Sequence, residues 1–155
     1  MSKISVLMSV YKKENPEYLR ASLESILVQT RTADEILLIE DGPLTQELYQ
    51  VVAEYQKKCD YLHVHAMEQN VQLGRALAKG VELCQYDLIA RMDTDDIAMP
   101  DRLEREGAYM EAHPEVDVVG GAIREFNDEG TIDRVKNMPK TQEEILEYVK
   151  VRNPL

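Results

Sequence analysis

The sequence predicts an α/β domain in which a mostly parallel sheet is flanked by helices. Apolar runs of strand length alternate with segments of helical periodicity, in the order β-α-β-α-β-α-β-α-β. The first two runs, Ile4–Val10 and Glu35–Glu40, are apolar almost throughout, as strands covered on both faces require. The chain has 155 residues, of which 44% are hydrophobic, so it can bury one substantial core, and we expect a single domain over residues 1–155.

The first strand, Ile4–Val10, is followed by a polar stretch and then by a helix. Asn15 is a typical N-cap residue, and Pro16 suits the first helical position, where no backbone N–H is needed. Apolar residues recur behind it at i, i+4, i+7 and i+8, which predicts one buried stripe: Leu19, Leu23, Ile26 and Leu27.

The second strand, Glu35–Glu40, ends at the turn signal Asp41-Gly42-Pro43. Helical spacing of apolar residues then predicts a helix over Gln46–Lys58. Residues 61–67 alternate in polarity and indicate a third strand near a sheet edge.

The second half of the chain continues the alternation. A helix is expected over 73–84, with one apolar side formed by Leu73, Leu77, Val81 and Cys84. A fourth strand, 87–92, leads directly into an acidic segment, and a helix over 100–113 follows. Residues 116–123 predict a fifth strand, and a capping box at 141–144 predicts a last helix over 143–150.

Charge and motif content exclude several classes of function. The net charge of −11 argues against a nucleic-acid partner, because phosphate backbones recruit basic surfaces. No stretch approaches the roughly 20 apolar residues of a membrane span, and neither a P-loop nor a G-x-G-x-x-G motif is present. Cys59 and Cys84 lack metal-ligand spacing, which suits free thiols in a reducing cytoplasm. We expect a cytoplasmic protein; peripheral attachment of the full-length protein to a membrane stays open.

Acidic residues follow two of the predicted strands. Asp41 comes after the second strand, and Asp93, Asp95 and Asp96 come after the fourth. Ligands of open parallel sheets bind at the carboxyl ends of the strands, so these four carboxylates and Tyr11 are expected on one rim.

Three carboxylates within four residues repel one another unless a cation is present. A hard divalent ion, Mg²⁺ or Mn²⁺, takes such oxygen ligands together with phosphate oxygens. Asp93, Asp95 and Asp96 are therefore candidate metal ligands that could neutralise a diphosphate. The alternative reading is structural, because aspartates in loops commonly cap helices and form Asx turns.

The chain resembles family 2 of the inverting glycosyltransferases, which have the Rossmann-like GT-A fold. The resemblance is carried by EILLIEDG, by NVQLGRALAKGVEL and above all by DTDD followed by PDRL, and it extends over most of residues 4–121. It implies transfer of a sugar from a nucleotide-diphosphate donor, a UDP-sugar in the first instance, to an acceptor hydroxyl. A role in cell-wall or polysaccharide biosynthesis is the corresponding biological expectation.

The resemblance also implies site roles. Val10 and Tyr11 would lie along the nucleotide base, and Asp41 would accept a hydrogen bond from its imide N–H. Further nucleotide-sugar contacts are expected on a loop-to-helix segment, at Asn70, Gly74 and Arg75. Others are expected on the D-x-D motif, at Asp93, Thr94 and Asp95. Asp95 would be the principal metal ligand and Asp96 a secondary one.

Nothing after Gly121 matches the family's acceptor region, so we expect an N-terminal fragment whose catalytic base lies beyond Leu155. The acceptor, whether a glycan, a lipid-linked sugar or a protein, stays open. The competing hypothesis is a non-catalytic nucleotide- or metal-binding module. An aspartyl-phosphate protein is disfavoured, because Ser9-Val10-Tyr11 places no acid at the end of the first strand.

Overall fold

The structure is a computed structural model that describes residues 1–127 and 132–151. Its contacts divide the chain into two compact units, Met1–Glu111 and Ala112–Leu155, and each is described by itself. The expected single domain over residues 1–155 stays a prediction.

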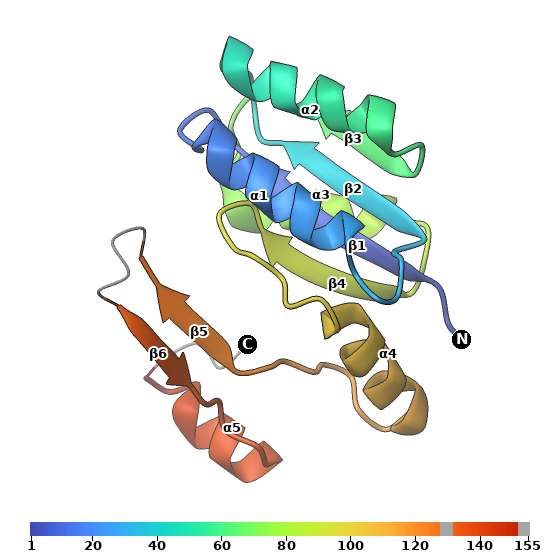
Figure 1. The fold of residues 1–155 in the computed structure, drawn as a ribbon. Helices are drawn as coiled ribbons and strands as arrows, with labels where there is room; N and C mark the ends of the chain where they lie inside the picture. Colours follow the sequence, from blue (N-terminus) through green and yellow to red (C-terminus); the bar gives the residue numbers. More distant parts are fainter. Residues whose placement is uncertain (128–131, 152–155) are drawn as a thin grey trace. The chain divides into compact units, whose positions relative to one another are not determined.

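The first unit is built on a four-stranded parallel sheet with strand order β3-β2-β1-β4 (Figure 1). The fold class predicted from the sequence is confirmed, and so is the position of the third strand at an edge. The strands are β1 (Ile4–Val10), β2 (Glu35–Glu40), β3 (Leu62–Ala66) and β4 (Leu88–Asp93).

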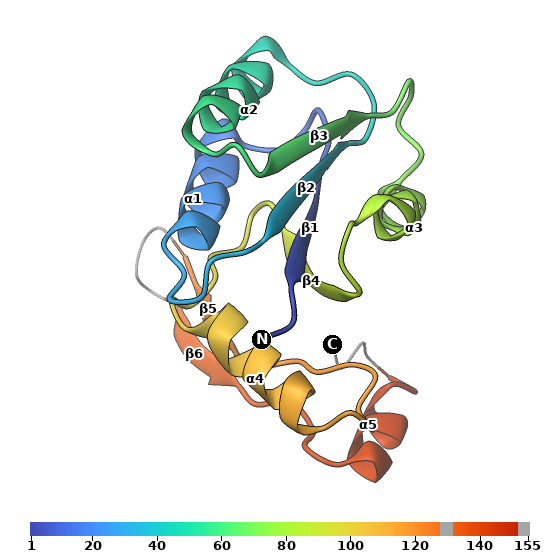
Figure 2. The same cartoon turned by 90° about the vertical axis from the view of Figure 1, so that its right-hand side faces the viewer.

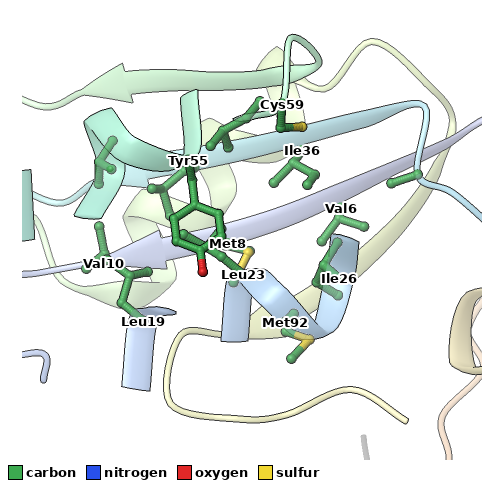
Figure 3. Close-up of a cluster of buried hydrophobic side chains, with 14 of the residues drawn as sticks. Val6, Met8, Val10, Leu19, Leu23, Ile26, Ile36, Tyr55, Cys59 and Met92 are labelled. Carbon is green, nitrogen blue, oxygen red and sulfur yellow. The ribbon is translucent and has the colours of Figure 1, made fainter. Parts of the chain in front are cut away.

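Helices cover both faces of this sheet, α1 (Pro16–Leu27) and α2 (Gln46–Lys58) on one face and α3 (Leu73–Leu83) on the other (Figure 2). The larger core lies between the sheet and α1 and α2, where side chains such as Val6, Met8 and Leu23 interlock (Figure 3). A smaller core beneath α3 contains Leu7, Leu37, Ile39 and Ala76. Strands β1 and β2 thus separate two apolar layers, which explains why both are apolar along most of their length.

Side chains cap the starts of α1 and α2, and the N-cap predicted at Asn15 is confirmed. The side chain of Asn15 accepts a hydrogen bond from Glu17 N, and Pro16 occupies the first position of α1. The side chain of Thr45 likewise accepts from Leu48 N at the start of α2. These contacts satisfy backbone donors that have no partner inside the helix, so they define where each helix begins.

The buried face of α3 differs from the predicted one. Ala76 and Gly80 are buried, whereas Leu73 and Val81, two members of the predicted stripe, are exposed. The reason is the close approach of the helix to the sheet: a Cβ at Gly80 would lie 2.3 Å from Leu7 Cδ1. Leu7 therefore fills the space that a larger helix side chain would need, and small residues form the contact.

The chain leaves the first unit through α4 (Arg102–Ala112). Within residues 1–127 and 132–151, every helix is too short or too polar to traverse a bilayer.

The second unit contains an antiparallel pair, β5 (Ile123–Phe126) and β6 (Asp133–Lys136), followed by α5 (Gln142–Tyr148). The prediction of a strand over 116–123 was wrong, because only Ile123 of that range belongs to a strand. Gly120 and Gly121 interrupt the run and favour irregular backbone, and the residues after them pair locally with β6 rather than with the parallel sheet. The capping box of α5 between Thr141 and Glu144 is confirmed.

Candidate functional site

The carboxyl ends of β2 and β4 flank the end of β1. In register, Ser9 lies between Ile39 on β2 and Asp93 on β4. Asp41 follows β2 directly, and its backbone N–H donates to Val10 O at 2.8 Å, which continues the sheet by one step. Neighbouring strands are about 4.8 Å apart, so Asp41 and Asp93 lie at the same rim with about 10 Å between their strands.

Asp93, Asp95 and Asp96 form a carboxylate cluster. Each offers an oxygen, and these oxygens all lie within 4.8 Å of one another. Asp93 is half-buried and also paired with the Arg91 side chain, while Asp95 and Asp96 are exposed. Oxygen ligands at this separation fit a hard divalent cation such as Mg²⁺ or Mn²⁺.

The electrostatics of the cluster bear most strongly on Asp96. Partial withdrawal of its carboxyl from water raises the pKa of Asp96, and repulsion by Asp93 and Asp95 raises it further. Arg91 and Arg102 oppose this increase with their positive charges. A cation bound among the three carboxylates would relieve the same repulsion.

Thr94 points away from the carboxylates and into the protein. It is buried, and its hydroxyl lies 2.6 Å from Glu14 Oε2 and 3.3 Å from Ser9 O. Glu14 in turn accepts from Asn15 N at 2.8 Å, at the start of α1. The side chain of Thr94, a predicted nucleotide-sugar contact, joins the acidic turn to the loop between β1 and α1.

The carboxylate of Asp41 is buried and holds the segment that leads to α3. It accepts hydrogen bonds from Asn70 Nδ2 at 2.9 Å and from Val71 N at 2.6 Å. Gly42 packs against the same segment with φ of 82°, and a Cβ there would lie 2.5 Å from Asn70 N. The structure thus brings together Asp41 and Asn70, two residues that the sequence analysis assigned to one site.

The first turn of α3 carries Gly74 and Arg75. Its N-cap residue, Gln72, has φ of 74° and makes no side-chain capping hydrogen bond, while its carbonyl oxygen accepts from Arg75 N and Ala76 N at 3.1 Å. The N–H groups of Leu73 and Gly74 come first in the helix, where no helix carbonyl can accept from them. A Cβ at Gly74 would meet nothing within 4 Å, and Arg75 is exposed. Backbone N–H groups, a positive helix end and a guanidinium together suit an anion.

Val10 and Tyr11 divide between the core and the surface. Val10 is fully buried in the larger core, and its carbonyl oxygen accepts from Asp41 N. Tyr11 is 44% exposed, and its carbonyl oxygen accepts from Glu14 N at 3.0 Å. An exposed aromatic ring at the end of β1 can lie against a nucleotide base.

Sequence reasoning missed two groups near this rim. Glu40, the last residue of β2, is only 6% exposed, and burial raises the pKa of its carboxyl. Ser22 and Ser25 of α1, and Gln29 just after it, are buried polar residues that bond to the acidic turn and the segment after it. Their i, i+3, i+7 spacing beside the apolar stripe is the signal that could have pointed to them.

The curated proteins that this chain is similar to include two bacterial glycosyltransferases of named activity or pathway. It is 43% identical over 150 residues to the amylovoran biosynthesis glycosyltransferase AmsE of Erwinia amylovora, covering 97% of this chain and 56% of that protein. It is 35% identical over 158 residues to the UDP-Gal:alpha-D-GlcNAc-diphosphoundecaprenol beta-1,3-galactosyltransferase of Escherichia coli, covering 98% and 55%. The chain therefore spans little more than half the length of these relatives.

Two solved structures share the fold. TarS of S. aureus, residues 1–349 with UDP-GlcNAc, matches with a TM-score of 0.64 and 23% identity, over 72% of this chain and 32% of that one. The mannosyltransferase PcManGT of Pyrobaculum calidifontis, with GDP-Man and Mn²⁺, matches with a TM-score of 0.66 and 14% identity, over 80% and 36%. Both likenesses support the GT-A arrangement of a mostly parallel sheet flanked by helices.

The family model for glycosyl transferase family 2 matches residues 5–154, which is nearly the whole chain. Together with the sheet-rim carboxylates and the sequence relatives, this match shows that the chain belongs to glycosyl transferase family 2.

Proposed function

We propose that this chain is the donor-binding part of a glycosyltransferase that transfers a sugar from a nucleotide-diphosphate donor to an acceptor hydroxyl with inversion. One observation carries the proposal: a cluster of three carboxylates and the buried Asp41 end two strands at the same rim of a family 2 sheet. The carboxyl end of a parallel sheet is where such folds bind nucleotides.

Asp95, with Asp93 and Asp96, would hold Mg²⁺ or Mn²⁺. Such an ion supplies Lewis-acid stabilisation of the negative charge that develops on a departing diphosphate. The chain's own contribution is to keep three carboxylate oxygens within 4.8 Å of one another at the end of β4. PcManGT, which shares the fold, holds Mn²⁺ together with GDP-Man, and this supports a divalent ion here.

The base and the diphosphate would meet different parts of the rim. Asp41 already accepts two hydrogen bonds, and a carboxylate offers about four lone-pair sites, so it can accept a further one from a uracil imide N–H. Tyr11 would lie along the base. Arg75 and the N–H groups around Gly74 would take phosphate oxygens, and together with the metal ion they would offset the net charge of −11. A UDP-sugar is therefore the donor that we propose.

The acceptor side is proposed to lie outside these residues. An inverting transfer needs a base within hydrogen-bond reach of the acceptor hydroxyl, and we place that base beyond Leu155. A glycan, a lipid-linked sugar or a protein could each be the acceptor. The length of the relatives, which exceeds that of this chain, supports a further acceptor-binding part.

Calorimetric titration of the 155-residue chain with UDP in the presence of Mn²⁺ tests the donor site. We expect heat of binding that disappears in the variant Asp95→Ala and persists in Asp60→Ala, an exposed aspartate just before β3 whose loss changes the net charge equally. Binding that is indifferent to Asp95, or no binding at all, would overturn the proposal. Donor binding by the complete gene product without any turnover would instead favour a non-catalytic nucleotide-binding module.

A further inference from the structure

A row of polar side chains on α1 and the residues just after it is buried. Ser22, Ser25 and Gln29 follow one another at i, i+3 and i+7, and their exposed fractions are 0%, 7% and 7%. Buried hydroxyl and amide groups destabilise a fold unless they have hydrogen-bond partners. Their partners therefore indicate what this row of side chains holds in place.

These partners lie in order along the segment 93–103. Ser22 Oγ donates to Asp93 O at 3.0 Å, and Ser25 Oγ accepts from Ala98 N at 3.0 Å. Gln29 Nε2 donates to Met99 O at 2.7 Å, and its Oε1 accepts from Leu103 N at 3.0 Å. The side chains of Ser22, Ser25 and Gln29 thus supply hydrogen-bond partners to the connection between β4 and α4 and to the residues at its two ends.

The two serines hold the two ends of the turn 93–98, which contains the carboxylate cluster. Ser25 Oγ also donates to Ser22 O at 2.7 Å, so the two anchors belong to one hydrogen-bonded unit. Between them, Asp95 and Asp96 have exposed side chains, and core packing does not hold them in place.

Mutual repulsion of the three carboxylates acts to open this turn. Anchoring its backbone at both ends opposes that repulsion and keeps the oxygens within 4.8 Å of one another. A cation then meets ligands that are already gathered, and little ordering remains to oppose its binding.

We propose that Ser22 and Ser25 are positioning residues for the carboxylate cluster and set its affinity for a divalent cation without touching the ion. The inference rests on the proposed function, in which this cluster binds the metal. Removing a group that orients a metal ligand through a hydrogen bond commonly weakens metal affinity by roughly 10- to 100-fold.

The test is the Mn²⁺ affinity of the 155-residue chain, measured by electron paramagnetic resonance of the free ion. Ser22→Ala and Ser25→Ala should each weaken Mn²⁺ binding by about tenfold. Ser25→Thr keeps the hydroxyl and should bind more tightly than Ser25→Ala. The matched control is Ser5→Ala: Ser5 is equally buried and hydrogen-bonded to Glu35, but it lies at the opposite end of the sheet.

A second measurement follows the turn itself without metal. In Ser25→Ala the amide of Ala98 loses its acceptor, and its hydrogen exchange should become roughly tenfold faster than in Ser5→Ala.

The outcomes separate the two proposals. If the unsubstituted chain does not bind Mn²⁺, the proposed function fails, and the inference fails with it. If it binds Mn²⁺ and the serine variants bind equally well, or no worse than Ser5→Ala, only the positioning role is overturned.

Discussion

The Asp41 carboxylate accepts a hydrogen bond of 2.6 Å from the backbone N–H of Val71, which lies 30 residues farther along the chain. Its other oxygen accepts from the side chain of Asn70 at 2.9 Å. A single buried acid, directly after β2, therefore holds the segment that leads into α3. The two places where we propose that the base and the diphosphate bind are connected through this residue.

Replacing Asp41 by asparagine should affect both stability and donor binding. The amide has only one acceptor oxygen and would turn its NH₂ group toward a donor, so one buried donor loses its partner. We expect the free energy of unfolding to fall by about 1–3 kcal/mol. Urea unfolding measures this, and Asp60→Asn, at an exposed position, should leave the midpoint unchanged. Equal midpoints for the two variants would contradict the anchoring role of Asp41.

Two glycines near the site should respond oppositely to substitution by alanine. Gly42 has φ of 82°, and a Cβ added there would lie 2.5 Å from Asn70 N. Gly42→Ala should therefore lower the free energy of unfolding by about 2 kcal/mol or more. Gly74 lies in a helix with open space around it, so Gly74→Ala should be neutral or stabilise by up to about 1 kcal/mol.

Gly74→Ala also tests the proposed phosphate site. If Gly74 lies against the diphosphate, Gly74→Ala weakens UDP binding while the thermal midpoint stays the same or rises. Undiminished UDP affinity in a stable Gly74→Ala protein would argue against a phosphate contact at this position.

Asp96 should make stability depend on pH in the absence of metal. Its pKa is raised in the folded protein, so folding favours the protonated form, and this contribution is lost as pH rises through the folded pKa. Asp96→Asn should therefore raise the free energy of unfolding at neutral pH, by less than about 1 kcal/mol because solvent screens an exposed group.

The gain in the free energy of unfolding from Asp96→Asn should shrink as pH falls below the ordinary pKa of an aspartate. There the Asp96 carboxyl is protonated in both the folded and the unfolded protein. Urea titrations in EDTA across this pH range measure the difference. A gain that is the same at acidic and neutral pH would show that repulsion within the cluster is not its source.

Arg75 should contribute to the affinity for the donor diphosphate. Its exposed guanidinium lies on the first turn of α3, and Arg75→Gln should weaken UDP binding by roughly tenfold, with the loss smaller at high salt. Lys79→Gln, about one turn farther along α3, removes the same charge away from the helix end and is the control. Calorimetry with UDP distinguishes the two, and equal losses would indicate a general charge effect.

Much of the rim could be predicted from the sequence because periodicity reports the type of each element. Ile4–Val10 and Glu35–Glu40 are too uniformly apolar for surface strands, and alternation with helices requires parallel pairing. Parallel strands end on one side, so the sequence alone places Asp41 and Asp93 at one rim. The caps at Asn15 and Thr141 were equally predictable, since their partners lie within three residues.

Only the tertiary structure decided which residues meet across the fold. The serines of α1 bond to a turn about 70 residues away, and Thr94 reaches Glu14 across 80 residues. The predicted apolar side of α3 was wrong at Leu73 and Val81, because the helix approaches the sheet through Gly80, where Leu7 fills the space. Such contacts depend on the volumes and hydrogen-bonding groups that packed elements present to one another, and local sequence spacing carries no information about them.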